Sequence, residues 1–379
     1  MVEHPAHAQA AIHPGTALAE GSCPVPHAES GHILLGHGSG GRLQEELLAS
    51  LVLPSLAAGR AARDRAAPLE DAALIAWPGL ECHGEAPDLR HELAFSTDSF
   101  VVNPLFFPGG DIGALAVHGT INDLAMRGAT PVALALAAII EEGLPFATLE
   151  AVLTSAGRAA SAAGVDVVTG DTKVVERGAA DRLFLTTTGI GRRLPGLRPS
   201  AAAARPGDAV LLSGPIGLHG VTVLSARGNL GFAADIASDT RPLHRLVQAL
   251  AALGPDVHTL RDPTRGGVAA ALGEIARDSC VGITVDEPAL PVPDPVAAAC
   301  DLLGLDPLHV ANEGCMLAMV ARGRADEALD LLRALPEGAQ AVRIGTVTDD
   351  RPGRVVLRTG LGGTRPLEMP IGEQLPRIC

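Results

Sequence analysis

Acidic residues recur in short turns of small residues, at points where a strand is expected to end or a helix to begin. Carboxylate and phosphate oxygens are the ligands that Mg²⁺ prefers, and neighbouring glycines let backbone amides approach phosphates. For any single turn, a helix cap or a turn former is the better explanation. Together they predict a site for a nucleotide and Mg²⁺. The turns are Glu70–Ala73, Ser96–Ser99, Gly109–Gly113, Asn122–Leu124, Gly170–Lys173 and Asp262–Gly267.

A glycine-rich segment, His37–Gly41, precedes an expected helix and is typical of a loop that holds phosphate, with Gly38 and Gly40 as its candidate contacts. Neither a P-loop nor a G-x-G-x-x-G dinucleotide motif is present. Lys173 would neutralise phosphate charge if it were buried, and Glu313 is a candidate base. The alternatives are a surface lysine and a turn carboxylate.

The chain ends in Pro376-Arg377-Ile378-Cys379. Counted from Leu361, such a tail would extend about 60 Å at most, so its thiol could visit another active site. Arg377 would favour the thiolate of Cys379. An incidental terminal cysteine explains the position equally well.

Hydrophobic periodicity predicts alternating strands and helices in two successive halves, which indicates an α+β fold of sandwich type. The helices are expected over 42–53 (closed by Pro54), from Asp111 onward, and over 148–163 and 267–277. The strands are expected over 72–77, 93–97, 132–140, 165–169, 183–190, 209–213, 281–285, 315–320 and 342–347.

The pattern divides the chain into four parts, with a boundary at the alanine run and Arg-Pro-Gly-Asp of 201–208. We expect a disordered extension over 1–31, domains over 32–200 and 201–360, and a mobile tail over 361–379. The extension holds several histidines and a cysteine, but their spacing fits no defined metal site, which favours a flexible tail over a metal store.

Composition excludes several classes of protein. With 29 Lys and Arg against 43 Asp and Glu, the net charge of −14 disfavours nucleic acid and anionic membranes as partners. The longest apolar run, 132–140, is too short to span a bilayer. No secretory signal is recognised, and six cysteines without a C-x-x-C pair suit a reducing compartment, so we expect a cytoplasmic protein.

Taken together, the sequence motifs described above resemble the HypE family of hydrogenase maturation proteins. This family belongs to the superfamily of aminoimidazole ribonucleotide synthetase (PurM), thiamin-monophosphate kinase and selenophosphate synthetase. The resemblance covers about residues 32–379, and the N-terminal extension departs from it. The aspartate turns carry the superfamily pattern, whereas the segments typical of HypE are 37–41, 97–102, 104–113, 170–175 and the terminal Pro-Arg-Ile-Cys.

The resemblance implies a two-domain PurM-like fold, a homodimer, and ATP with Mg²⁺ as cofactors. The implied Mg²⁺ ligands are Asp71, Asp98, Asp123 and Asp262. The implied catalytic residues are Cys379, Glu313 and Lys173. The residues expected to bind the nucleotide are Gly38, Gly40, Gly109, Gly110, Asp111, Asn122, Gly170, Asp171 and Thr172.

The resemblance further implies an ATP-dependent dehydration. HypF would carbamoylate the terminal cysteine, and the protein would then convert the thiocarboxamide to a thiocyanate. The cyano group would pass to iron on the HypC-HypD complex, as a cyanide ligand of a [NiFe]-hydrogenase. Two alternatives are an ATP-dependent phosphotransferase or synthetase acting on a free metabolite, and a non-enzymatic scaffold with a docking tail. The acidic turns weigh against the scaffold.

Overall fold

The computed structural model describes residues 33–38, 41–56, 69–76, 92–228, 236–370, 375 and 377–379. The expected extension over 1–31, the candidate Gly40 and Pro376 of the terminal motif lie outside the described residues. Residues Leu34–Cys379 form one compact unit, to which everything below refers. Among the helices that the structure describes, none is long and apolar enough to cross a membrane.

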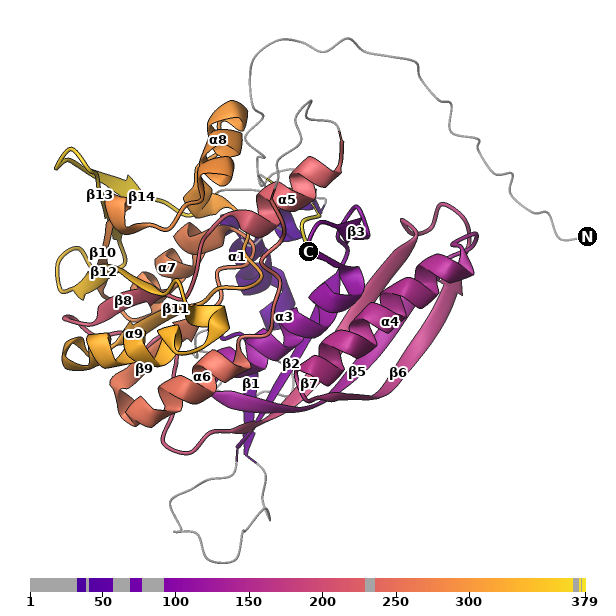
Figure 1. The fold of residues 1–379 in the computed structure, drawn as a ribbon, viewed down its shortest axis with the longest axis horizontal. Helices are drawn as coiled ribbons and strands as arrows, with labels where there is room; N and C mark the ends of the chain where they lie inside the picture. Colours follow the sequence, from indigo (N-terminus) through magenta and orange to yellow (C-terminus); the bar gives the residue numbers. More distant parts are fainter. Residues whose placement is uncertain are drawn as a thin grey trace, which may run out of the picture. The chain divides into compact units, whose positions relative to one another are not determined.

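The first half of this unit contains a five-stranded sheet in the order β1-β2-β7-β5-β6 (Figure 1). All neighbouring strands are antiparallel except β5 and β6, which run parallel. The strands are β1 (Ala73–Ala76), β2 (Glu92–Phe100), β5 (Ala129–Glu141), β6 (Asp166–Val175) and β7 (Leu183–Arg193), with a small hairpin of β3 (Phe106–Phe107) and β4 (Gly110–Asp111).

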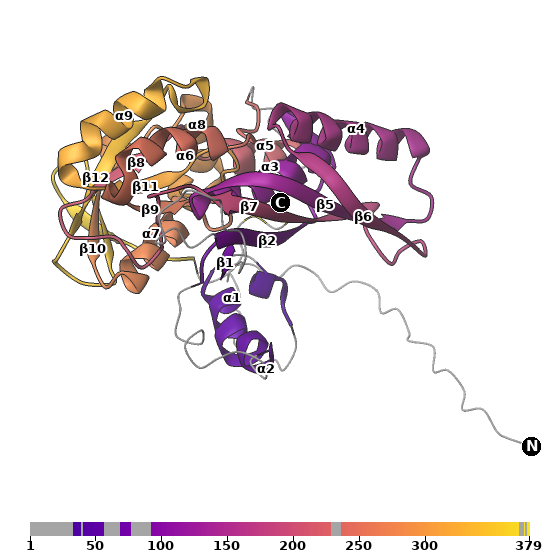
Figure 2. The same cartoon turned by 90° about the horizontal axis from the view of Figure 1, so that it is seen from below.

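Two helices, α3 (Ile112–Met126) and α4 (Phe146–Ala162), lie on one side of this sheet (Figure 2). Along β2 and β7, residues that face α3 are buried and alternate with residues that are partly or fully exposed. The buried rows pack with Ile112, Leu115 and Ala116 of α3. One face of the sheet is therefore covered, and the opposite face is not packed against α3 or α4.

The second half forms a seven-stranded sheet in the order β14-β13-β10-β12-β8-β11-β9. Its strands are β8 (Ala209–Leu212), β9 (Val257–Arg261), β10 (Gly282–Asp286), β11 (Leu317–Val320), β12 (Val342–Thr348), β13 (Val355–Arg358) and β14 (Thr364–Leu367). Its helices are α5 (Leu218–Ala226), α6 (His244–Leu250), α7 (Gly267–Asp278), α8 (Asp294–Leu303) and α9 (Ala325–Arg333).

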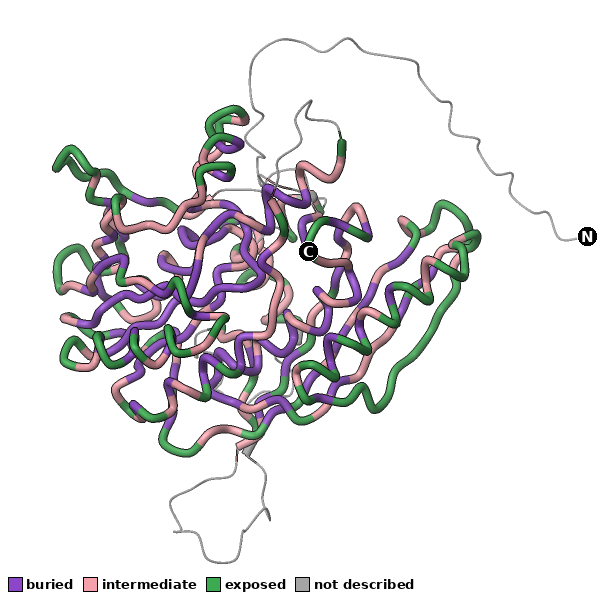
Figure 3. Tube along the Cα trace, viewed as in Figure 1, coloured by how far each residue is buried: buried purple, intermediate pink, exposed green. Residues whose placement is uncertain are grey.

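Alternate residues of this second sheet enter two separate cores. Val210 and Leu212 of β8 pack with α7, whereas Leu211 packs with α6 and α9. The seven strands thus lie between two helical layers. Figure 3 shows in purple that much of the chain in this half is buried. The short connecting helices are η2 (Leu35–Gly38), η6 (Ala251–Asp256), η7 (Glu287–Ala289), η8 (Pro307–His309), η9 (Arg322–Arg324) and η10 (Pro336–Gly338).

Each of the nine strands expected from the sequence is present, with ends shifted by a few residues. The expected helix at 42–53 is α1 (Arg42–Leu47), a π turn η3 (Leu48–Val52) and α2 (Leu53–Leu56). Pro54 does not close it, because proline is tolerated in the first turn of a helix, where its missing N–H has no partner to lose.

The last segment differs most from expectation. We expected 361–379 to lack regular structure and packing, but residues 364–367 form β14, which pairs antiparallel with β13. Ile378 and Cys379 are buried in the core that also holds Phe100 and Val102. That part of the prediction is wrong, because pairing with β13 and burial of Ile378 compensate for a composition rich in Gly and Pro.

Candidate active site

Three aspartates from distant parts of the chain meet where the two sheets adjoin. Carboxylate oxygens of Asp71, Asp123 and Asp262 all lie within 4.8 Å of one another. Asp71 precedes β1, Asp123 lies on α3, and Asp262 directly follows β9. The cluster therefore depends on both halves of the unit being in place.

Hydrogen bonds and one arginine hold these carboxylates. Ser96 Oγ donates to Asp123 Oδ2 at 2.6 Å. Arg261 Nη1 lies 2.9 Å from Asp71 Oδ1, and the other guanidinium nitrogen lies 2.5 Å from Glu274 Oε2. Asp262 Oδ2 is buried and has no hydrogen-bond partner among the described residues.

The cluster is electrostatically strained without a cation. Burial raises the pKa of Asp123 well above its usual value, and the charges of Asp262, Asp71 and Asp98 raise it further. Burial and Asp71 raise the pKa of Asp262 to about 7. Burial also raises the pKa of Asp98, on β2. Crowded carboxylates with an unpartnered oxygen are the donor set that a hard divalent cation requires, so the residues present fit Mg²⁺.

Glu313 lies beside this cluster and is only 3% exposed. Burial raises its pKa well above the usual value, with further contributions from Asp262 and Asp98. Its backbone is fixed by Asp239, whose two carboxylate oxygens accept from the Glu313 and Gly314 amides at 3.2 and 2.9 Å. Asp239 was missed from the sequence, because nothing local to it marks its contact with a loop 74 residues away.

A buried asparagine joins the Glu313 loop to the turn after Asp262. Asn312 Oδ1 accepts from Gly217 N at 2.7 Å, and its Nδ2 donates to the Pro263 carbonyl at 2.9 Å. The positions of Glu313 and Asp262 are therefore coupled through one side chain.

Arg265 is a second cation of the site besides Arg261, and it was not singled out, although it stands inside the Asp262–Gly267 turn. Negative charge at Cys379 raises the pKa of the Arg265 guanidinium, burial lowers it, and Asp98 and Glu313 raise it further. Its Nη1 also donates to the Gly38 carbonyl at 3.4 Å. One guanidinium thus links the chain terminus, the carboxylates and the glycine-rich segment.

The terminal cysteine lies at this site. Cys379 is 8% exposed, and its backbone carboxylate oxygen accepts from Val101 N, directly after β2, at 3.1 Å. His219 Nε2 contacts the Ile378 carbonyl at 2.9 Å, and Figure 1 shows the C-terminus near α5, which carries His219. Pro370 O accepts from Arg42 N, so the chain is still held at residue 370, well after Leu361.

The structure does not bring the 170–173 turn to this cluster within the chain. The turn lies on β6, an edge strand exposed along nearly its whole length (Figure 3). Lys173 Nζ pairs with Asp171 Oδ2 at 2.6 Å, and both side chains are more than half exposed. A Cβ on Gly170 would lie 1.9 Å from the Leu136 carbonyl, so this glycine permits close pairing with β5.

Four other expected nucleotide contacts have structural partners. Asp111 caps α3 by accepting from the Gly113 and Ala114 amides at 2.7 and 3.2 Å. Asn122 Nδ2 donates to the Arg241 carbonyl, and Asn122 Oδ1 accepts from Leu243 N. A Cβ on Gly109 or Gly110 would collide with the 238–240 segment. Gly38 is exposed, with open space around it.

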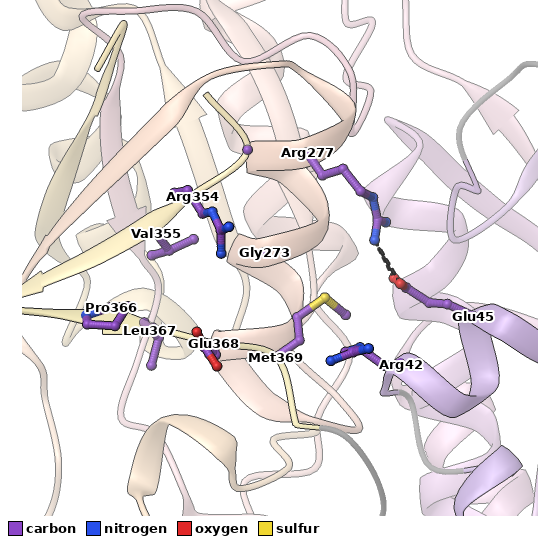
Figure 4. A pocket seen from close by; sticks show the side chains of 11 residues that line it. Arg42, Glu45, Gly273, Arg277, Arg354, Val355, Pro366, Leu367, Glu368 and Met369 are labelled. Carbon is purple, nitrogen blue, oxygen red and sulfur yellow. Dashed lines mark hydrogen bonds and ion pairs between the residues drawn. The ribbon is translucent and has the colours of Figure 1, made fainter. Parts of the chain in front are cut away.

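Two cavities share the ion pair in which Arg277 Nη1 donates to both carboxylate oxygens of Glu45, and Figure 4 shows this pair beside one of them. The larger, of about 690 Å³, is bordered by Glu70 and by Arg261, the partner of Asp71, so it opens beside the carboxylate cluster. Three leucines on its wall give it an apolar side: Leu48, Leu53 and Leu69. The smaller, of about 390 Å³, is the one drawn in Figure 4, and it is lined by Arg42, Arg354 and Met369 among others.

Comparisons with known proteins agree on one family. Residues 69–193 match the N-terminal domain of AIR synthase related proteins, and residues 205–358 match the C-terminal domain. The carbamoyl dehydratase HypE of Azotobacter vinelandii is 50% identical over 350 residues, which cover 92% of this chain and 98% of that protein.

Solved structures give the same result. A crystal structure of a HypE–HypF complex matches with a TM-score of 0.77 and 45% identity, over 87% of this chain and 100% of that one. A HypE structure in complex with ATP matches with a TM-score of 0.73 and 49% identity, over 92% and 100%.

Proposed function

Since the chain belongs to the HypE family of hydrogenase maturation proteins, we propose that it is an ATP-dependent carbamoyl dehydratase acting on its own terminal cysteine. The observation that carries the proposal is the burial of Cys379 beside Arg265, within the charged surroundings of Glu313 and the aspartate cluster. A docking tail without chemistry would not need its thiol there.

The reaction balances with ATP as the acceptor of the oxygen. The carbamoyl oxygen of the Cys379 thiocarboxamide attacks the γ-phosphorus of ATP, and ADP leaves. The nitrogen loses its two protons, the C–O bond breaks, and phosphate departs to leave a thiocyanate. Phosphorylation is needed because an amide oxygen is otherwise a very poor leaving group.

Each group of the site has a proposed task. Asp71, Asp123 and Asp262, with Asp98 beside them, would hold Mg²⁺, which supplies charge compensation for the phosphates when bound. Glu313 accepts a proton from the carbamoyl nitrogen. Arg265 faces the terminus and stabilises negative charge that develops on the departing oxygen.

We propose the 690 Å³ cavity as the nucleotide pocket. It has the volume of a ligand pocket, an apolar wall suited to a base, and a border at Arg261 and Glu70 next to the metal cluster. The glycine-rich segment reaches the site through the contact of Gly38 with Arg265.

A homodimer is proposed from the uncovered face of the five-stranded sheet. Phe95 and Ile190 lie directly opposite each other on β2 and β7, and both are exposed. Ile139 on β5 is also exposed and pairs with Phe184 on one side and Lys173 on the other. Adjacent apolar side chains on a sheet are a typical surface for a second copy.

We further propose HypF as the carbamoyl donor and the HypC-HypD complex as the acceptor of the cyano group. Support for the first comes from the complex in which a close relative is bound to HypF. The two parts of the chain, 32–200 and 201–360, are proposed as domains because strands up to residue 193 and from residue 209 enter separate sheets.

Intact mass spectrometry tests the function. After incubation with HypF, carbamoyl phosphate and ATP, the chain should first gain a carbamoyl group and then become one water lighter, with both changes on the terminal peptide. Cys379→Ser should bind ATP and form no thiocyanate. ATP consumption that required only a free metabolite would overturn the proposal in favour of a kinase-like relative.

A further inference from the structure

The arginine two residues before the terminus is held by groups outside the carboxylate cluster. Arg377 Nη1 donates to Asp181 Oδ2 at 2.5 Å, and its Nε donates to the Val101 carbonyl at 2.9 Å. The guanidinium carbon lies 5.8 Å from the centre of the Phe184 ring. The Arg377 guanidinium is therefore contacted in three ways, through Nη1, through Nε and through the Phe184 ring.

The backbone of the same residue is held from the other side. The Arg377 carbonyl accepts from Arg227 Nη2 at 2.7 Å and from Asn103 N at 3.3 Å. Arg227 Nε in turn donates to the Asn103 carbonyl at 2.8 Å. Arg227 thus ties the tail to the segment after β2, against which Cys379 also pairs.

We propose that Asp181 and Arg227 are positioning residues that recognise Arg377 and hold the terminal cysteine at the active site, and that opening of this contact, here called the arginine latch, frees the tail for a partner. The inference rests on the proposed function, since it supposes that Cys379 must serve two sites. Neither residue touches the reacting atoms.

The latch suits an arginine and not simply a positive charge. A lysine ammonium offers a single donor point, whereas the guanidinium contacts a carboxylate and a carbonyl at once and stacks on a ring. The Asp181 and Arg377 side chains remain 39% and 29% exposed, so the pair is partly hydrated. A partly exposed ion pair adds little net stability, so a modest competing interaction can open it.

The tail has the reach that this exchange requires. Its base is fixed where Pro370 O accepts from Arg42 N. The nine residues after Pro370 span about 30 Å when extended, enough to carry the thiol off the protein surface. The balance between the docked and released tail is then set by the packing of Leu375 and by contacts of the last three residues.

Thiol labelling measures this balance without any activity. A maleimide is added to the nucleotide-free protein, and modification is mapped by peptide mass. Exposed Cys280 serves as the internal reference, because it lies in another part of the unit. Asp181→Asn should raise the labelling rate of Cys379 roughly tenfold and leave that of Cys280 unchanged, as expected for loss of one charge-assisted contact.

A matched control is available in Asp256, which pairs with Arg324 at 3.0 Å and is 38% exposed. Asp256→Asn removes a similar charge from a similar pair and should leave both rates unchanged. Arg227→Gln should act in the same direction as Asp181→Asn. Asp181→Asn keeps the tail sequence intact, so a partner that reads Arg377 is not disturbed.

Activity measurements should then move in opposite directions. In Asp181→Asn, dehydration of the carbamoylated chain should slow several-fold at saturating ATP, while carbamoylation by HypF should be equal or faster. If Asp181 had a purely structural role, Asp181→Asn would slow both dehydration and carbamoylation. Adding Arg377→Gln to Asp181→Asn should slow dehydration no further than Arg377→Gln alone, because the two residues act as one unit.

The outcomes separate the two proposals. Unchanged Cys379 labelling in both Asp181→Asn and Arg227→Gln overturns the latch, whatever the enzyme does. Faster labelling, with no dehydration in any variant or in the parent chain, supports the latch as a tail contact and overturns the proposed function. Slower carbamoylation together with slower dehydration also overturns the latch.

Discussion

At the scale of single residues, the site is a set of charges that disfavour one another until a cation binds. Asp71, Asp98, Asp123 and Asp262 all have a raised pKa, with burial as the largest cause. An acid whose pKa is higher in the folded than in the unfolded chain keeps its proton longer when folded. Its contribution to stability is therefore full at low pH and is lost as the pH rises.

The first prediction follows from that sign. In EDTA, the unfolding temperature should fall between about pH 4 and about pH 7, the interval between the usual pKa of 3.8 and that of Asp262. Asp262→Asn should flatten this fall by removing one of the crowded charges. Excess Mg²⁺ should raise the midpoint of the parent chain more at pH 7.5 than at pH 5.5, measured by scanning calorimetry. A Mg²⁺ effect that is equal in Asp262→Asn contradicts the assigned ligand.

The second prediction concerns Glu313. Burial and the neighbouring carboxylates raise its pKa well above the usual value, and a cation bound at the cluster would offset the charge of those carboxylates. Glu313→Gln should bind ATP and accept the carbamoyl group, then lose water about 10²–10⁴-fold more slowly. The mass should remain that of the carbamoylated chain. Exposed Glu176→Gln is the control, and equal rates in both variants contradict the role of base.

Sequence reasoning reached the acidic residues and the terminal thiol but not their supports. Asp71, Asp98, Asp123 and Asp262 were expected as one metal set, and carboxylate oxygens of Asp71, Asp123 and Asp262 lie within 4.8 Å of one another. Asp239 and Arg227 could not be found, because each acts on a backbone far along the chain and carries no local motif. Asp111 and Asn122, which were expected to contact the nucleotide, also serve as a helix cap and as a brace between segments of the folded chain.

At the scale of elements, periodicity predicted nine strands and four helical segments, but it missed helices α5, α6, α8 and α9 and strands β9, β13 and β14. The helix α5 was missed because five of its nine residues are buried, from His219 to Val223, which leaves little amphipathic contrast. The strand β14 was missed because it contains Pro366 and exposes three of its four residues. Proline is accepted there because β14 is an edge strand.

The third prediction concerns the docked terminus as an element. Ile378 is 3% exposed, and truncating such a side chain in a fixed core costs about 2–5 kcal/mol. A tail that can undock limits this loss to its own docking energy. Ile378→Ala should therefore lower the unfolding free energy by less than about 2 kcal/mol in denaturant titration, yet expose Cys379 to maleimide. Leu272→Ala in the core of the second sheet should cost the full amount. Equal losses contradict a separable tail.

At the scale of the whole molecule, the uncovered sheet face sets the fourth prediction. Ile190→Lys places a charge opposite Phe95 within the proposed interface. It should convert a dimer to monomers in sedimentation velocity at micromolar concentration. Phe146→Lys is the matched control, because Phe146 is 91% exposed at the start of α4, on the other side of the sheet. Dissociation by the control variant would instead assign the interface to α4.

The last prediction joins that face to the chemistry. Lys173 was expected to be catalytic, yet within one chain the structure gives its ammonium only Asp171 as a described partner. Lys173 pairs with Ile139 across β5 and β6, so it lies on the uncovered face, where only a second copy could bring it to a reacting group.

Mixed dimers decide whether it does so. Lys173→Ala and Cys379→Ser should each be inactive as homodimers. After mixing in equal amounts and exchange, half of the dimers combine the intact lysine of one chain with the intact cysteine of the other. About a quarter of the parent thiocyanate yield should then return. Activity of the Lys173→Ala homodimer would make Lys173 a surface residue, and absence of recovery would confine its action to its own chain.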